Sequence, residues 1–249
     1  MRESLFNDFE RQVEKLSLEI RAHYEPYETE GYKFMGDGII NLRRYYEVTP
    51  KILWILKEPY ADGGGWSISE AFNLSNAELM APERKLHKSK TWLPVIYSCY
   101  AIYNGMIPWD WISYPENDSN VLDSLKNIAI MNILKIPGET TTPPAKLTAG
   151  YEKHWEILKK QIETYNPDIV IAGNTLSHFK KHLSLDSGEF DYNYTHDLWL
   201  KDGKVYIDCK HPSTTLLSDA KIENYVDGIT EIIRVWADKN GVTLKTQPS

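Results

Sequence analysis

Apolar residues recur along the first part of the chain at the spacing of one helical face. They are separated by four, four, three and four positions and comprise Leu5, Phe9, Val13, Leu16 and Ile20. This spacing places them on one stripe of an α-helix. The residue before a proline disfavours helical backbone, so the helix should end before Pro26. The pattern predicts an N-terminal helix over residues 1–25.

A similar apolar stripe returns near the other end of the chain. Its members are Ile222, Tyr225, Val226, Ile229, Ile232, Ile233 and Trp236. Ser218 or Asp219 is a suitable N-cap, and Gly241 follows the stripe, as is common after the last turn of a helix. We therefore predict a helix over residues 218–240. A third stripe at the same period runs from Trp155 to Tyr165 and predicts a helix there.

Four short apolar runs lie between these helical segments, each bounded by polar or turn residues. They occupy residues 52–56, 128–132, 168–172 and 205–209. Continuous apolarity is typical of strands covered on both faces, as in a parallel sheet, and the intervening segments are long enough for crossover helices. The pattern predicts an α/β protein, a three-layer α/β/α sandwich with a central, mainly parallel four-stranded sheet.

Length and composition agree with one folded domain over residues 1–249. The AVILMFWYC set makes up 42% of the chain and charged residues 25%, as in ordinary globular proteins. The longest apolar runs fall short of the roughly 18–20 residues that a membrane span needs. Acidic residues stand where a signal peptide would be apolar, and Cys99 and Cys209 are the only cysteines. We expect a cytoplasmic protein with free thiols.

The charge balance bears on possible partners. The 28 Lys and Arg residues against 35 Asp and Glu residues give a formal net charge of −7, whereas nucleic-acid-binding domains usually have a basic face. One local exception comprises Arg84, Lys85, Lys88 and Lys90. This basic patch could contact the phosphates of single- or double-stranded DNA. The alternative interpretation is a solvated helix start or loop.

Polar residues follow the predicted strands. Ligands of open α/β sheets collect at the carboxyl ends of the strands, so these positions are the candidates for chemistry. The first strand leads into Lys57 and Glu58, the second ends in Asn132, and the fourth leads into His211. A carboxylate, a carboxamide and an imidazole would therefore converge on one edge of the sheet.

This set of strand ends resembles the uracil-DNA glycosylase superfamily. That family has a first motif of the type G-Q-D-P-Y, an Asn at the end of a middle strand, and a last motif H-P-S-P. The matching stretches here are LKEPY at 56–60, MN at 131–132 and HPST at 211–214. The resemblance spans residues 50–220. The chain departs from the motifs at Leu56, Lys57, Glu58 and Thr214.

The resemblance implies a role for each matched residue. Glu58 would position the attacking water and stabilise positive charge on the sugar. Tyr60 would close the space beside the pyrimidine C5 position and so reject thymine. Asn132 would bind the Watson–Crick edge of the extruded base. His211 would stabilise the departing base anion, and with Glu58 it forms the implied catalytic pair.

Two further contacts complete the implied base pocket. A stacking ring would come from Phe72 or Trp66, with Phe72 preferred on spacing, and Ser213 would contribute to substrate binding. The implied activity is hydrolysis of the N-glycosidic bond of uracil or another damaged base in DNA, a step of base-excision repair. No metal or redox cofactor is expected, because the iron–sulfur branch of the family needs four cysteines and this chain has two.

Two other functions remain open. The altered first motif and the net charge of −7 favour a non-catalytic protein that binds a nucleotide, a base or a protein partner. A hydrolase of a free nucleoside would need no basic surface at all. Two lesser patterns are also ambiguous. The glycines at 63–65 form a phosphate-binding nest or, more simply, a flexible loop. His178 and His182 could share a metal, but no third ligand accompanies them at zinc-site spacing.

Overall fold

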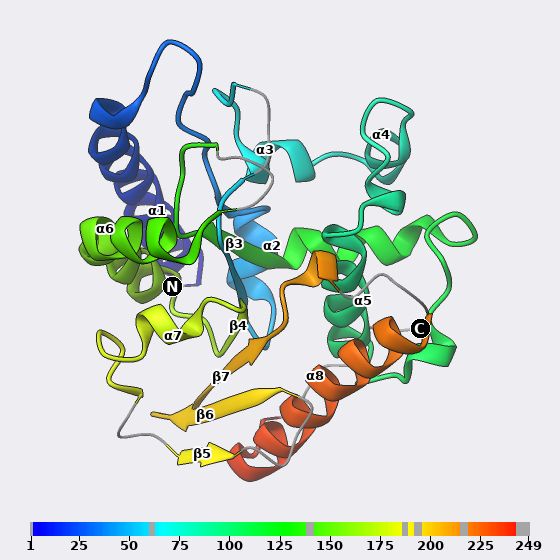
Figure 1. Ribbon diagram of the computed structural model, residues 1–249. Helices are drawn as coiled ribbons and strands as arrows, with labels where there is room; N and C mark the ends of the chain where they lie inside the picture. Colours follow the sequence, from blue (N-terminus) through cyan, green and yellow to red (C-terminus); the bar gives the residue numbers. More distant parts are fainter. Residues whose placement is uncertain are drawn as a thin grey trace.

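The computed structural model describes residues 2–59, 63–137, 142–185, 189–191, 196–214 and 219–242 (Figure 1). The helices are α1 (Arg2–Tyr24), α2 (Leu42–Glu47), α3 (Ile68–Phe72), α4 (Asn76–Met80), α5 (Trp92–Tyr103), α6 (Pro144–Tyr165), α7 (Leu176–Phe179) and α8 (Asp219–Asn240). Short 3-10 segments are η1 (Glu25–Tyr27), η2 (Leu86–Lys88), η3 (Trp109–Trp111), η4 (Ser119–Asn127) and η6 (Pro212–Thr214).

One sheet runs through the described residues in the order β1-β3-β2-β4-β7-β6-β5. Its strands are β1 (Gly38–Ile39), β2 (Ile52–Leu56), β3 (Ile128–Asn132), β4 (Ile169–Gly173), β5 (Glu189–Asp191), β6 (Asp197–Lys201) and β7 (Lys204–Cys209). The pairs β2–β3, β2–β4 and β4–β7 are parallel. The outer pairs β1–β3, β6–β7 and β5–β6 are antiparallel.

Successive side chains of the central strands enter two separate cores, because residues alternate between the faces of a sheet. Trp54 faces the core that includes α5 and α8. Its neighbours Leu53 and Ile55 face the core that includes α1, α6 and α7. Figure 1 shows these two groups of helices on opposite sides of the sheet. The chain therefore has three layers, helices, sheet and helices, and the predicted α/β class is confirmed.

The strongly periodic segments form where the sequence predicts them. Helices α1 and α8 match the expected spans 1–25 and 218–240 to within one residue at each end, and α1 ends before Pro26, which lies in η1. Strands β2 and β3 coincide with the apolar runs 52–56 and 128–132. Helix α6 begins at Pro144 and so extends well before Trp155.

The sheet is wider than expected. The four predicted strands are its parallel centre, but β1, β5 and β6 extend it to seven. Strands β6 and β7 form a hairpin across Asp202 and Gly203, which both have positive φ angles, 53° and 74°. This geometry suits the right-handed twist of paired strands, and an Asp-Gly pair is its usual sequence signal.

Both thiols are free and buried. Cys99 accepts a hydrogen bond from the Trp54 indole at 3.3 Å, and Cys209 lies 2.9 Å from the Tyr225 hydroxyl. Burial raises the pKa of each thiol to about 12. The expectation of free thiols is confirmed, and neither cysteine has the thiolate character that nucleophilic chemistry needs. No helix in the described part of the chain is long and apolar enough to cross a membrane.

Candidate functional site

The carboxyl ends of the central strands bring the predicted site segments together. Leu56, the last residue of β2, is the register partner of Asn132, the last residue of β3. A Cβ built on Gly173 at the end of β4 would lie 3.1 Å from Leu56 Cδ2 and 3.7 Å from His211 Cα. The backbones that carry Glu58, Asn132 and His211 therefore meet at one edge of the sheet.

Asn132 is buried with part of its side chain unsatisfied. The residue is 2% exposed, and its Nδ2 atom has no hydrogen-bond partner among the described residues. Leaving a buried donor unpaired costs about 1–3 kcal/mol, so such groups are rare in folded proteins and need an explanation. An amide kept in this state at a strand end is suited to a ligand that supplies the missing acceptor.

The turn after β7 fixes the tautomer of His211. The Ser213 backbone N–H donates to His211 Nδ1 at 3.3 Å, and Ser213 Oγ lies 2.8 Å from the same nitrogen. Because a backbone N–H can only donate, Nδ1 must be an acceptor. Burial, and then the positive charge of Lys57, lower the pKa of His211 to about 4. At neutral pH the ring is therefore uncharged, and its proton is on Nε2.

Glu58 follows β2 by two residues and is half-buried, with its Oε2 atom shielded from solvent. Lys57, which stands where the uracil-DNA glycosylase motif has Gln, is also half-buried. Its charge lowers the pKa of both His211 and His178, so it lies within electrostatic reach of the last motif. Tyr60 lies outside the described residues, and the structure does not place it.

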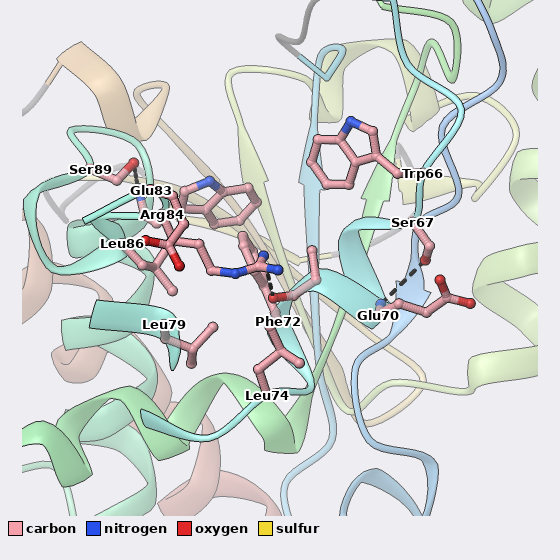
Figure 2. A pocket seen from close by; sticks show the side chains of 12 residues that line it. Trp66, Ser67, Glu70, Phe72, Leu74, Leu79, Glu83, Arg84, Leu86 and Ser89 are labelled. Atoms are coloured by element: carbon pink, nitrogen blue, oxygen red, sulfur yellow. Dashed lines mark hydrogen bonds between the residues drawn. The ribbon is translucent and has the colours of Figure 1, made fainter. Parts of the chain in front are cut away.

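The predicted stacking rings, Trp66 and Phe72, line a cavity that we call the aromatic cavity (Figure 2). Its volume is about 600 Å³, and it is lined by Trp66, Ser67, Glu70, Ala71, Phe72, Leu74, Leu79, Glu83, Arg84, Leu86, Ser89 and Trp92. Phe72 is 8% exposed and packs edge-to-face on Trp92, with ring centroids 4.6 Å apart. Trp66 is 44% exposed. Of the two rings, Trp66 offers far more open surface to a ligand.

The basic patch lies beside the aromatic cavity. Arg84 lines the cavity, and its Nη1 donates to the Ala71 carbonyl at the end of α3 at 3.4 Å, as drawn in Figure 2. Lys85 immediately precedes η2, Lys88 is its last residue, and Lys90 lies two residues after its end. All four side chains are exposed. They are thus available to anionic ligands next to an aromatic surface.

The glycines at 63–65 form part of a folded loop beside the site. Their φ angles are 80°, 74° and 83°, values that favour glycine. Gly63 accepts a hydrogen bond from the Lys33 N–H at 2.7 Å, and Gly65 donates to the Phe34 carbonyl at 3.2 Å. These contacts tie the loop to Lys33 and Phe34, and the Gly65 N–H is thereby not available to a phosphate.

His178 and His182 both lie against Tyr151. His182 Nδ1 is 2.8 Å from the Tyr151 hydroxyl, and the His182 ring stacks on Trp155 at 4.1 Å between centroids. His178 lies 5.7 Å from the Tyr151 ring. In the part of the chain that the structure describes, no three His, Cys, Asp or Glu residues gather as metal ligands.

Sequence reasoning missed two charged residues at the site edge. Asp37 and Lys135 form a buried ion pair, with 2.6 Å between Nζ and Oδ2, and both contact the backbone of Asn132. The two residues are 98 positions apart, so no local pattern connects them. The only local signals are an acid between two glycines, Gly36 and Gly38, and a lysine three residues after Asn132.

The sequence matches no family model and no curated protein.

Proposed function

We propose that this chain is a uracil-DNA glycosylase-like protein that hydrolyses the N-glycosidic bond of uracil or another damaged base in DNA. The proposal includes the fold: the four parallel strands at the centre of the sheet would be the uracil-DNA glycosylase-like core, with the motifs at their carboxyl ends. Its support is the site geometry together with the order and placement of the three motifs.

The observation that carries the proposal is the buried Asn132 amide, whose Nδ2 has no hydrogen-bond partner in the part of the chain that the structure describes. The Watson–Crick edge of uracil presents carbonyl oxygens and one N–H. A carboxamide has a donor and an acceptor side by side and can pair with such an edge. Enzymes that excise a base must hold it outside the helix by contacts of this kind. A base bound at Asn132 would supply the acceptor that Nδ2 lacks among the described residues.

The reaction follows from the charges that develop. The bond between C1′ and the base nitrogen breaks, and its electron pair leaves with the base. His211 Nε2–H donates to a base oxygen as negative charge builds there. The Glu58 carboxylate stabilises the cationic sugar, orients a water molecule toward C1′ and accepts a proton from that water as the new C–O bond forms. Water is the only co-reactant.

A neutral His211 fits this role better than a protonated one. Burial and, after it, the positive charge of Lys57 disfavour a cationic imidazole and so lower the His211 pKa. The neutral ring with its proton on Nε2 offers one donor, and Ser213 holds its other nitrogen. Ser213 therefore acts in this proposal by orienting the ring.

The DNA strand around the extruded base would cross the aromatic cavity. Bases of single-stranded segments stack on aromatic side chains, and phosphates pair with nearby Lys and Arg. The exposed Trp66 ring and the basic patch around Arg84 supply both kinds of contact on a chain whose net charge is −7. This local arrangement favours DNA over a free nucleoside as the substrate.

The test is incubation with single- and double-stranded oligonucleotides that contain one uracil, at low salt, followed by alkaline cleavage at abasic sites. Low salt is needed because phosphate contacts weaken steeply as salt rises. We expect a single strand break at the uracil position. Release of base from free deoxyuridine, with no cleavage of the oligonucleotides, would favour a nucleoside hydrolase. Binding of uracil without any hydrolysis would favour a non-catalytic protein.

A further inference from the structure

Asp37 and Lys135 are buried charges that the proposed reaction does not use. The Asp37 side chain is 1% exposed and the Lys135 side chain 0%. The Lys135 ammonium donates to both carboxylate oxygens, at 2.7 and 2.6 Å. Burial lowers the pKa of Lys135, and the attraction of Asp37 opposes that shift. Buried pairs of this kind are weak evidence for stability, because desolvation can exceed their attraction. Their presence needs another reason.

Both members of the pair contact the backbone of Asn132. Asp37 Oδ2 accepts from the Asn132 N–H at 2.7 Å, and Lys135 Nζ donates to the Asn132 carbonyl at 3.2 Å. The N–H and the carbonyl belong to the two peptide planes on either side of the Asn132 Cα. Fixing both planes fixes the direction of the Cα–Cβ bond, and therefore the point from which the side-chain amide extends.

The Asp37 carboxylate takes the place of a strand partner at the end of β3. Strand β1 is antiparallel to β3, with Gly38 opposite Ile130 and Ile39 opposite Ala129. The pairing ends at Gly38 and Ile130, so among the described residues the last two residues of β3 have no strand partner on that side. The Asp37 side chain reaches the Asn132 N–H instead. A charged acceptor makes a stronger hydrogen bond than a carbonyl does, which favours a rigid strand end.

Helix α6 holds the carboxylate from the other side. Gln161 Nε2 donates to Asp37 Oδ1 at 2.9 Å and contacts the Tyr165 hydroxyl at 3.1 Å. Gln161 is itself fully buried. Asp37 therefore has partners from β3, from the segment after β3 and from α6, and its own position is fixed by all three.

We propose that Asp37 and Lys135 are positioning residues for Asn132, which aim its amide at the edge of the bound base. This inference rests on the proposed function and names the residues that give it selectivity. Base recognition through two adjacent hydrogen bonds is directional. A rotation of the Asn132 side chain would therefore weaken binding of the correct base and allow other bases to bind. A displacement of about 1 Å in such a site can cost 10²-fold in rate.

The experiment compares Asp37→Asn and the double variant Asp37→Asn/Lys135→Met with wild type. The double variant removes both charges, so it stays folded if a lone buried lysine unfolds the single variant. Tyr45→Phe is the matched control. The Tyr45 hydroxyl donates to the Tyr165 carbonyl at 3.3 Å, a buried hydrogen bond in the same core that does not involve Asn132.

Two readouts are measured on each protein. The first is NMR of the Asn132 amides together with their hydrogen exchange, with the side-chain NH₂ signals assigned by their loss in Asn132→Asp and the backbone N–H signal assigned by sequential backbone correlations. This readout needs no substrate. The second is the excision rate on the uracil oligonucleotide and the affinity for free uracil. Expected results for the charge variants are shifted Asn132 signals, backbone exchange faster by about tenfold and excision slower by about 10–10²-fold.

The outcomes separate the two proposals. Unchanged Asn132 signals and exchange in a folded charge variant would overturn the positioning role, whatever the excision rate of that variant. Equal changes in Tyr45→Phe would do the same, because they would show general loosening of the core. If the Asn132 signals respond as expected but the wild type neither binds uracil nor cleaves the oligonucleotide, the structural linkage stands and the proposed function fails.

Discussion

The proton on His211 is fixed by two atoms of one neighbouring residue, the backbone nitrogen and the hydroxyl of Ser213. The sequence shows a His-Pro-Ser turn after a strand, and from this alone one can expect the imidazole at the carboxyl edge of the sheet. The low pKa of His211 depends on its burial and on Lys57, which follows β2 and is distant in the sequence. Such contacts between distant segments leave no local pattern in a sequence.

We predict that the His211 ring stays neutral down to about pH 4, where its pKa lies. Nitrogen NMR of the imidazole between pH 8 and pH 4 should show one neutral form, with the proton on Nε2, until the acid end of the range. For the same reason the excision rate should have no inflection near pH 6.5 that depends on His211. A ring that titrates near 6.5, or a proton on Nδ1, would contradict the assigned role.

We expect Asn132 to lower the stability of the folded protein while it serves ligand binding. Replacing it by Leu, which has the same branched shape, removes the Nδ2 donor that has no partner among the described residues. The change should raise the free energy of unfolding by about 1 kcal/mol, because an unpaired donor no longer has to be buried. The same change should abolish binding of free uracil. Chemical denaturation and calorimetric titration measure the two effects.

The control for this substitution is Asn127, another buried amide. Its Oδ1 accepts from Arg44 Nε at 2.8 Å, so Asn127→Leu should lower the free energy of unfolding by leaving the guanidinium without that partner. A loss of stability in Asn132→Leu as large as in Asn127→Leu would mean that the Asn132 amide is satisfied in the folded protein.

At the scale of elements, the sequence predicts the helices and strands that have a regular apolar pattern and misses those that have none. The central strands and the long helices α1 and α8 have uninterrupted apolar patterns, because each buries a whole face. Strand β1 has two residues and no pattern of its own, and it forms only because β3 offers an edge. The β6–β7 hairpin did carry a signal, the Asp202-Gly203 turn.

The loop at 63–65 gives an element-scale prediction. Gly64 has a φ of 74°, and a Cβ there would overlap the Lys33 carbonyl oxygen and lie 2.9 Å from Pro137 Cγ. Gly64→Ala should therefore lower the free energy of unfolding by about 1–3 kcal/mol, the usual cost of a strained backbone position. Gly31→Ala is the control, since a Cβ at Gly31 meets nothing within 4 Å. Equal denaturation midpoints for the two variants would show that the loop tolerates a side chain.

At the scale of the whole molecule, burial makes the histidines sensitive to acid. Burial is the largest cause of a lowered pKa at His23, His154, His178, His196 and His211. A lowered pKa in the folded state means that the unfolded chain binds protons more readily in acid. The stabilising contribution of each neutral ring is complete above about pH 6.5 and is lost as the pH falls toward its folded pKa, about 4 for His154 and His211.

The melting temperature should therefore fall progressively between pH 6.5 and pH 4, with proton uptake on unfolding in that range. Calorimetric melts at several pH values in one salt concentration measure both. A melting temperature that stays constant or rises through this window would contradict the burial of these rings.

The candidate site was only partly predictable. The positions of Glu58, Asn132 and His211 at strand ends could be predicted, because each apolar run shows locally where its strand stops. Asp37 meets Lys135 and Gln161, which lie 98 and 124 residues further along the chain. A buried ion pair of this kind is visible only once the sheet order places the segment before β1 against the end of β3.

The central claim is that Glu58, Asn132 and His211 form one base-excising site. Its most direct test is the single-turnover excision rate on a uracil-containing oligonucleotide at low salt, measured for wild type, Glu58→Gln and Glu163→Gln. Glu163 is an exposed carboxylate on α6 that pairs with Lys159 and controls for the change in charge. We predict that Glu58→Gln lowers the rate by about 10²–10⁴-fold while its fold is unchanged, and that Glu163→Gln retains the wild-type rate. No excision by the wild type, or an unchanged rate in folded Glu58→Gln, would contradict the account.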